Sequence, residues 1–557
     1  MPSNLCIIED KEDFKLFKKN INPKDCIFVP LNIETLIECI KAKFNIIDFK
    51  KYLDNEFHQS ALLESKRFTD SIKFNHKIEY SLKSEIIALL RFRLHSSIFL
   101  IELIERSIKD LNFRTIVVSG ITKNTHSLHN SKIVTDIIIN LYGSITNTLI
   151  IQNSKIEHSP TLFEYFTLTS LHGDKQKILM SNGGYNFSKL SKLFKKKDID
   201  CWIPIFTKMT LLKRLYFKYY LKLNIIIFQK NTSKPRAKKS FVQPIDFSYK
   251  NNFELSNILN LFVDKLEFYF NDINEKINSI KNFVNQNKFN LALSNIARGV
   301  DGSILDKNLS LPSVCISHGI VCKGFNKFDE IYKKIIAEAV FNGDSKYFSI
   351  QSKIMHDSLQ SHKISGKKVI TGNLIFANKQ NKKKGQTYLL FASTVKDFSN
   401  LQFLGVEMFY EYWNSLNDLD YIANKFKEKI VVKVHPSIVL SSDELKKIFR
   451  NLIFSNSKID NLLKNASALL SYSSSSIEDS LNSKVPVLLY DPYKRYEHLK
   501  AIRPSAKDEP IHYIETREKL IETIKQIKNT KMFNFDNYIY HQNFYDSVNK
   551  NIIPLLD

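Results

Sequence analysis

The sequence predicts an α/β protein with two large domains that face each other across a cleft, preceded by a mainly helical segment. Three observations predict this fold class. At 557 residues the chain is too long for one ordinary domain. Hydrophobic residues make up 43% of it, which is ample for packed cores and excludes a mainly disordered chain. Short β-branched runs also alternate with helical stretches, as they do in parallel sheets.

Residues 1–112 are expected to be mostly helical. Apolar residues have helical spacing over 32–44, and residues 80–111 would form a helix of several turns. That helix leads into residues 114–120, a β-branched run that ends in glycine. Such a run is typical of a buried parallel strand, so we expect the first α/β domain to begin there.

Residues 113–378 are expected to complete this first domain, which spans 1–378. The expected strands are at 114–120, 148–152, 177–180, 291–295, 312–317 and 368–372, and the expected helices at 253–286 and 328–341. Residues 379–386 are charged and loop-like, so we place the domain boundary there.

Residues 387–557 are expected to form the second domain. Its expected strands lie at 388–392, 430–434, 468–471 and 485–490, and its expected helices at 404–416, 445–449, 477–482 and 519–528. The tail from Phe533 is expected to return to the first domain.

Two segments of the first domain need separate interpretation. Residues 207–224 are basic and aromatic at helical spacing, which suits a helix on a membrane surface or a helix that packs its aromatic face into the core. We favour the packed helix. Residues 230–249 contain Pro235 and Pro244 among polar and basic residues, and we expect a surface loop.

The chain is strongly basic, with 81 Lys and Arg against 57 Asp and Glu, a net charge of +24. This charge suits an anionic partner such as nucleic acid, an anionic membrane face or a phosphorylated substrate. It equally suits drift toward A/T-rich codons, because the chain is also rich in Asn and Ile. Both interpretations stay open.

The expected location is cytoplasmic, with possible peripheral attachment to the inner membrane. The first ten residues lack the basic start and apolar run of a secretory signal, and the six cysteines lack metal-binding spacing. Residues 86–108, the most apolar stretch, are interrupted by charged residues such as Arg91 and Glu102. A membrane span needs roughly 20 apolar residues, so none is expected.

Polar clusters follow three of the predicted strands. They are Ser317-His318-Gly319, Lys433-Val434-His435-Pro436 and residues 471–479. In open α/β sheets ligands bind at the carboxyl ends of the strands, so these clusters are the candidate site. His318 is well placed to act as a general base on a hydroxyl, and His435 could donate to a phosphate or act as an acid. Either histidine could instead only hydrogen-bond within its loop.

The third cluster contains four consecutive serines, Ser473, Ser474, Ser475 and Ser476. Their hydroxyls and the free N–H groups of the following helix would suit a diphosphate. Glu478, in the first turn, could accept from ribose hydroxyls. The alternative is an ordinary serine N-cap with Glu478 as the acid of a capping box.

The order of these clusters resembles the two-domain GT-B glycosyltransferases of bacterial surface-polysaccharide synthesis. The similarity is to capsule and lipopolysaccharide enzymes with cytidine-activated donors and to teichoic-acid glycerophosphotransferases. Residues 311–323 match the family's His-Gly segment, 433–436 its Lys-x-His-Pro motif, and 473–478 with Pro486-Val487 its serine-acid motif. Residues 369–376 match the segment before the crossover, with Leu374 in place of proline. The extra serines leave Glu478 or Asp479 as the family's carboxylate, and we prefer Glu478.

The resemblance implies a role for each matching residue. His435 and the serines Ser473 to Ser476 would hold the donor's phosphates, with Lys433 and Arg495 neutralising charge. Glu478 would contact the ribose or the base-side hydroxyls of the nucleotide. His318 would face the acceptor or the donor and could be the base in a direct displacement. The resemblance also makes 1–378 the acceptor-side domain and 387–557 the domain that binds the donor nucleotide. The family needs no metal and no cofactor besides the donor. The pairs Asp198/Asp200 and Asp418/Asp420 are interpreted as solvated surface.

The implied activity is transfer of a sugar from a nucleotide donor, CMP- or CDP-linked, to a cell-surface polysaccharide or lipid-linked acceptor. One alternative is a sugar-nucleotide epimerase of the same architecture, which would need further carboxylates in the cleft. Another is a basic nucleic-acid-binding protein, suggested only by the charge. The sequence has no helix-turn-helix, zinc-finger or RNA-binding signature, so nucleic acid is not an expected partner.

Overall fold

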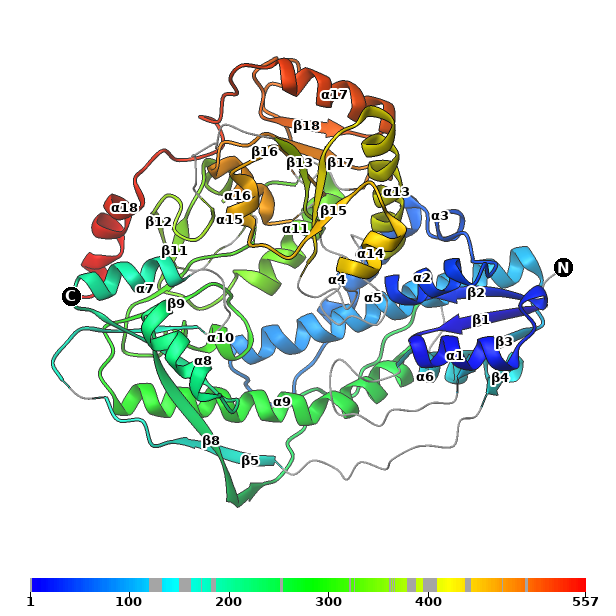
Figure 1. The fold of residues 1–557 in the computed structure, drawn as a ribbon. Helices are drawn as coiled ribbons and strands as arrows, with labels where there is room; N and C mark the ends of the chain where they lie inside the picture. Colours follow the sequence, from blue (N-terminus) through cyan, green and yellow to red (C-terminus); the bar gives the residue numbers. More distant parts are fainter. Residues whose placement is uncertain are drawn as a thin grey trace.

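The computed structural model forms three parallel sheets with helices packed around them (Figure 1). It describes residues 3–119, 133–149, 162–171, 173–181, 187–250, 254–319, 322–324, 326–359, 362, 364, 366–377, 387–393, 408–435, 442–472, 474–495 and 499–557.

The first sheet is small, with the strand order β2-β1-β3-β4 and parallel pairing throughout. Its strands are β1 (Asn4–Ile8), β2 (Cys26–Pro30), β3 (Thr115–Ser119) and β4 (Thr146–Leu149). Most of 1–112 is helical, as predicted, but the strands β1 and β2 were not predicted. Each is a five-residue apolar run, too short for its periodicity to separate strand from helix, and β1 acquires its neighbour β3 only from a distant part of the chain.

Helices surround this sheet and extend beyond it. They are α1 (Lys11–Asn20), η1 (Pro23–Asp25), α2 (Ile33–Lys41), α3 (Phe49–Tyr52), α4 (Asn55–Ser71), α5 (Tyr80–Leu111), α6 (Ile133–Tyr142) and η2 (Gly143–Ile145). The expected helix over 80–111 is confirmed as α5, which ends at Asn112 in the left-handed conformation. The polar residues of its middle turns are buried as well, because other helices cover it on several sides.

The second sheet has eight strands in the order β12-β11-β10-β9-β6-β7-β8-β5. Its strands are β5 (Leu162–Thr167), β6 (Lys177–Met180), β7 (Asp200–Ile205), β8 (Asn224–Arg236), β9 (Leu291–Ser294), β10 (Ser313–Cys315), β11 (Tyr347–Ile350) and β12 (Lys367–Ile370). Only β5 is antiparallel to its neighbour. If β5 is left out and the other strands are numbered from β6, their order is 3-2-1-4-5-6-7, which is a doubly wound arrangement. The strand order reverses between β6 and β9, and this is the switch point of the sheet.

The helices of this part range in length from five residues to 33. They are α7 (Phe187–Lys196), α8 (Leu211–Leu215), the π-helical turn η3 (Tyr216–Leu221), α9 (Glu254–Gln286), α10 (Gly299–Ser303), α11 (Lys327–Val340) and α12 (Lys353–Ser358). In Figure 1, α5 and α9 run along each other through the middle of the molecule, and their buried side chains belong to one hydrophobic core.

Two predictions for this part are wrong. Residues 230–236 belong to β8 rather than to a loop; Pro235 is tolerated because β8 pairs there only with the edge strand β5. Residues 207–224 do include a helix, α8 with η3, but its aromatic face is not packed into the core: Tyr219 is 61% and Tyr220 55% exposed.

The third sheet has six parallel strands in the order β15-β14-β13-β16-β17-β18. Its strands are β13 (Tyr388–Phe391), β14 (Ile430–Lys433), β15 (Ile453–Ser455), β16 (Ala466–Ser471), β17 (Val487–Tyr490) and β18 (Ile511–Ile514). Its helices are α13 (Phe409–Phe426), α14 (Ser442–Ile448), α15 (Ile459–Leu463), α16 (Ser476–Asn482) and α17 (Arg517–Asn529). Counted from β13, the order is 3-2-1-4-5-6, so the predicted α/β class with two Rossmann-type sheets is confirmed.

The chain ends with α18 (Phe544–Asn551) and η4 (Ile553–Leu555), which pack on the second sheet. Val548 and Ile552 are fully buried in the core that contains β6 and β9, and the side chain of Asn290 donates a 3.2 Å hydrogen bond to the carbonyl of Leu556. Figure 1 shows the C-terminus beside α7. The C-terminal tail, which follows the third sheet in the chain, thus packs on the second sheet.

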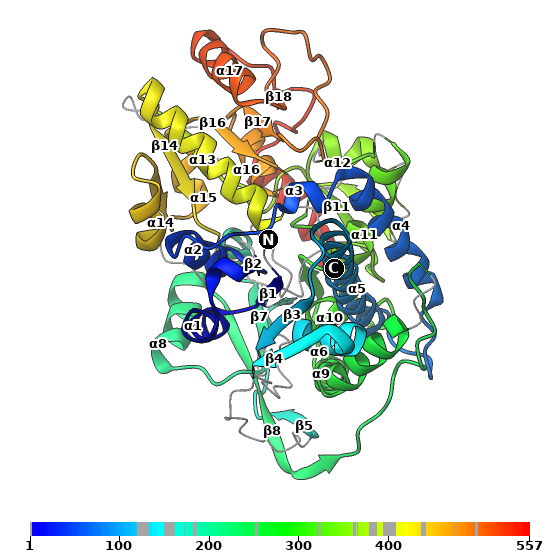
Figure 2. The same cartoon turned by 90° about the vertical axis from the view of Figure 1, so that its right-hand side faces the viewer.

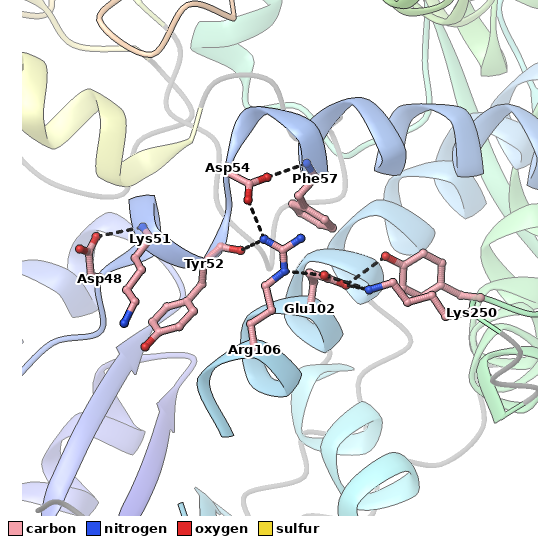
Figure 3. Close-up of polar contacts among 9 residues, drawn as sticks. Asp48, Lys51, Tyr52, Asp54, Phe57, Glu102, Arg106 and Lys250 are labelled. Atoms are coloured by element: carbon pink, nitrogen blue, oxygen red, sulfur yellow. Dashed lines mark hydrogen bonds and ion pairs between the residues drawn. The ribbon is translucent and has the colours of Figure 1, made fainter. Parts of the chain in front are cut away.

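A buried carboxylate organises the helical region near α5. Glu102, 2% exposed, accepts hydrogen bonds from Lys250 at 2.7 Å and from Arg106 at 2.6 Å (Figure 3). Arg106 also donates to the carbonyl of Tyr52 and to the carboxylate of Asp54. Burial alone would raise the pKa of Glu102, but the hydrogen bonds from Lys250 and Arg106 lower it below its usual value.

Candidate functional site

The carboxyl ends of the second and third sheets meet. Ser352 follows β11, and its hydroxyl donates a 2.9 Å hydrogen bond to the carboxylate of Glu478 in α16. The next residue, Asp479, accepts a 2.6 Å hydrogen bond from the backbone N–H of Ala377. Both contacts join a strand end of the second sheet to the helix that follows β16. The two sheets therefore present the edges at which doubly wound proteins bind ligands toward one junction.

Two buried polar side chains are hydrogen-bonded where the strand order of the second sheet reverses, between β6 and β9. Ser181 follows β6 and donates a 3.3 Å hydrogen bond to the side chain of Asn295, which follows β9. The carbonyl of Asn295 lies 2.8 Å from Nδ1 of His318. His318, at the end of β10, is thereby fixed beside the switch point of this sheet. The backbone of its neighbour Ser317 accepts from Gln351, the residue before Ser352.

This contact determines the proton position on His318. A carbonyl oxygen only accepts, so Nδ1 carries the proton and the neutral ring has its lone pair on Nε2. Burial lowers the pKa of His318 below its usual 6.5; the hydrogen bond to Asn295 opposes this shift and the charge of Arg298 adds to it. A half-buried imidazole that is neutral near pH 7 can act as a general base.

The switch point of the third sheet lies between β13 and β16. Ser471 ends β16, and its hydroxyl donates to the carbonyl of Ala392 at 2.7 Å. Ser393, the second residue after β13, is 4% exposed, and its hydroxyl has no hydrogen-bond partner within the described ranges. A buried hydroxyl without a partner is uncommon, so it is a candidate contact for a ligand.

Within the serine cluster, one hydroxyl accepts a hydrogen bond from a neighbouring backbone N–H. Ser474 accepts a 3.3 Å hydrogen bond from the backbone N–H of Ser476, and Ser475 stands at the N-cap of α16 without capping it through its side chain. Ser476 is 7% exposed, and its hydroxyl has no partner among the described residues. Ser473 lies outside the described residues. The capping-box alternative does not hold, because Glu478 bonds Ser352 instead.

Glu478 and Asp479 are both buried at the junction. Burial raises the pKa of Glu478 to about 7, partly offset by the Ser352 hydrogen bond, and burial raises that of Asp479 to about 7. Asn482 also lies 3.4 Å from the second carboxylate oxygen of Glu478. Both oxygens of Glu478 thus have protein partners, and the side chain is fully buried, so the predicted ribose contact is not open in this structure.

Lys433, the last residue of β14, lies near Asp479 at this junction. Burial lowers the pKa of Lys433, and attraction to Asp479 opposes the shift. His435 is half-buried two residues after the strand. His318, Lys433 and Glu478, predicted from three separate clusters, are thus gathered where the two sheets meet.

Arg495 comes five residues after the end of β17. It forms an ion pair with Glu411 and lines a cavity of about 150 Å³ together with His58 and Phe99 of the N-terminal helices. Lys494 also lines this cavity. The predicted phosphate contact of Arg495 therefore stays a prediction, since its charge already faces a buried carboxylate.

His95 lines the same cavity and was not among the predicted site residues. It is 2% exposed, and neither ring nitrogen has a hydrogen-bond partner in the described part of the chain. Burial, with a contribution from Arg91, lowers its pKa to about 3. The only signal in the sequence is an ionisable residue in an apolar stretch of α5.

Among the described residues, no cluster of three or more His, Cys, Asp or Glu side chains could bind a metal ion. None of the described helices combines the length and apolarity that spanning a bilayer requires. Asp198 is 71% exposed and pairs with Lys175, as expected for surface.

No protein-family model matches the chain, and no curated protein sequence matches it. Among solved structures, UDP-GlcNAc 2-epimerase of Methanocaldococcus jannaschii is similar at 15% identity and a TM-score of 0.43, over 69% of this chain and 99% of that chain. The wall teichoic acid polymerase TagF is similar at 12% and 0.39, over 69% and 88%. TarM of S. aureus is similar at 12% and 0.41, over 69% and 100%. Similarities this distant assign no activity to the chain.

Proposed function

We propose that this protein is a glycosyltransferase, or a closely related group transferase, that uses a nucleotide-activated donor. The observation that supports the proposal is the meeting of the carboxyl edges of two doubly wound sheets at one junction. Each doubly wound sheet offers a ligand site where its strand order reverses, and the Ser352–Glu478 contact brings the two carboxyl edges together. Two sites that face each other suit a reaction between two bound substrates.

In this proposal the third sheet binds the donor. Ser393, Ser474 and Ser475 lie around its switch point and would bind the phosphates, with Lys433 and His435 from β14 supplying positive charge or a proton. The donor is proposed to be CMP- or CDP-linked, which rests on the resemblance of the strand-end motifs. The acceptor, a cell-surface polysaccharide or a lipid-linked glycan, would approach from the second sheet.

The proposed chemistry is a displacement at the donor. Nε2 of His318 takes the proton of the acceptor hydroxyl, and the acceptor oxygen forms a bond to the transferred group. The bond from that group to the donor phosphate breaks, and the electron pair passes to the phosphate oxygen. His435 and the N–H groups that precede α16 stabilise the resulting charge without a metal.

The test is a thermal-shift panel with CMP, CDP, UDP, GDP and a short DNA duplex, on the wild-type protein and on His435→Ala. A ligand at about 100 times its Kd stabilises the folded state by about 2.7 kcal/mol, which is readily measured. We expect one pyrimidine nucleotide to raise the Tm of the wild type and not of the variant. A shift with DNA alone would contradict the proposal and favour a nucleic-acid-binding protein.

A sugar-nucleotide epimerase is the second candidate, favoured by one observation. Two carboxylates, Glu478 and Asp479, are buried side by side at the junction, and carboxylates with raised pKa values can act as acid and base. Incubation with a nucleotide sugar in heavy water, without acceptor, separates the candidates. An epimerase that removes a carbon-bound proton incorporates deuterium into the sugar, whereas the transferase leaves it unlabelled.

A further inference from the structure

The helix formed by α8 and η3 exposes an unusual set of side chains. Six large hydrophobic residues in Leu211–Tyr220 are 40–80% exposed, and Leu211 and Leu212 reach 70% and 80%. No residue of α8 or η3 is buried. Elsewhere in the described ranges, exposed large hydrophobic residues occur singly or in pairs, as on most protein surfaces. A cluster of six such residues is instead typical of a contact surface.

This helix is nevertheless firmly attached to the molecule. Thr210 caps its start through the N–H of Lys213, and the hydroxyl of Ser191 on α7 donates a 2.6 Å hydrogen bond to the carbonyl of Leu221. Phe217 and Leu221 pack against the second sheet's core. Figure 2 shows α8 at the left-hand edge of the molecule. The exposed face is thus presented by a fixed helix.

The charge around the helix has one sign. Residues 201–245 contain ten Lys and Arg and no Asp or Glu. Lys213, Arg214 and Lys218 lie on the helix itself, are exposed, and form no ion pair with any described acidic residue. Leucines with tyrosines and unpaired basic residues are the composition of helices that lie in the boundary between lipid head groups and acyl chains.

A basic cavity adjoins this face. Lys189, Lys192 and Lys196 of α7 line a space of about 340 Å³ that also borders α18, and no acidic residue is among its lining residues within the described ranges. Lys192 also lies over the ring of Tyr220, 4.5 Å from its centre, so cavity and exposed helix are continuous. A phosphate of a lipid head group would meet these ammonium groups.

We propose that α8 and η3 dock the protein on an anionic membrane surface, with Leu211 and Leu212 inserted among the lipids and Lys213, Arg214 and Lys218 at the head groups. A second copy of the chain is the less suitable occupant, because self-association would bring two strongly basic faces together. Nucleic acid is also less suitable, since it offers no partner for the two most exposed leucines. The inference concerns binding and does not depend on the proposed transferase activity.

The test is flotation of the full-length protein with vesicles of phosphatidylcholine alone and of phosphatidylcholine with phosphatidylglycerol. We expect binding to the anionic vesicles. Leu211→Ser/Leu212→Ser and, separately, Lys213→Ala/Arg214→Ala/Lys218→Ala should each weaken it about tenfold or more. Because all five side chains are exposed, circular dichroism and Tm should match the wild type.

Two matched control variants distinguish membrane binding by this face from non-specific hydrophobic or electrostatic binding. Ile502→Ser/Met532→Ser removes side chains that are 53% and 80% exposed, and Lys15→Ala/Lys18→Ala/Lys19→Ala removes exposed charge from α1, which Figure 1 places at the other end of the molecule. Both should bind like the wild type.

Three results would overturn the proposal. One is no vesicle binding by the wild type, and another is equal loss in the control variants. The third is a dimer in sedimentation velocity, or a complex with DNA, that Leu211→Ser/Leu212→Ser abolishes while vesicle binding persists.

Discussion

The hydroxyl of Ser352 and the carboxylate of Glu478, 126 residues apart in the chain, form a 2.9 Å hydrogen bond between the second and third sheets. Neither side chain is exposed, so the bond is part of the packed interior where the carboxyl edges meet. It joins the segment after β11 in the second sheet to α16, the helix that follows β16 in the third.

The first prediction concerns the pH dependence of stability. Glu478 has a folded-state pKa of about 7, above its ordinary 4.5, so the folded protein binds this proton more tightly than the unfolded chain does. The free energy of unfolding should therefore fall as pH rises from about 4.5 to about 7. Glu478→Gln should remove up to about 3 kcal/mol of this fall. Chemical denaturation at several pH values in that range measures it.

The control for this prediction is Glu518→Gln, whose carboxylate is 74% exposed. This variant should keep the wild-type pH dependence. A Glu478→Gln protein with an unaltered slope between these pH values would show that Glu478 does not titrate in this range.

The second prediction tests the proposed base. His318→Asn should cut transfer by about 10²- to 10⁴-fold, the usual contribution of a general base, while Tm changes little. Since the pKa of His318 lies below 6.5, the wild-type rate should stay level down to pH 6.5 and fall only below it. Initial rates with the nucleotide donor found by thermal shift give both results. His541→Asn should leave the rate unchanged, because His541 lies on the surface, where its ring is 2.7 Å from the carboxylate of Asp536.

The third prediction concerns the support of the His318 site. A Cβ on Gly302 in α10 would lie 2.3 Å from the backbone carbon of Ala297, just after Asn295. Gly302→Ala should therefore shift this segment and lower the free energy of unfolding by about 1–3 kcal/mol. Gly143→Ala is the control, because a Cβ there meets nothing within 4 Å. Equal stability of both variants would contradict the packing described around α10.

The fourth prediction concerns Glu102, where the pKa shift has the opposite direction. Its folded-state pKa lies below the ordinary 4.5, so its ion pairs stabilise the fold above pH 4.5 and this contribution is lost as pH falls through the folded pKa. Glu102→Gln should cost about 1.5–3 kcal/mol at neutral pH and less in acid. Denaturation curves at pH 7 and pH 3 measure the difference. The exposed Glu56→Gln should behave as the wild type at both.

The sequence predicted best where a local pattern is enough. The helices over 80–111 and 253–286 and the strands at 177–180 and 388–392 follow from periodicity and β-branched runs that hold in any packing context. The strand-end position of His318 and Lys433 followed in the same way, because a polar residue after an apolar run marks where the run ends.

Tertiary structure decided what depends on distant parts of the chain. Strand β1 pairs with β3, which comes from a distant part of the chain. Glu478 is buried against the second sheet, where the hydroxyl of Ser352 donates a hydrogen bond to its carboxylate. The exposure of Leu211 and Leu212 was likewise undecided by spacing, which fixes one face of a helix but not what covers it. Periodicity is a property of neighbouring residues, whereas burial and pKa are set by residues that only the fold brings near.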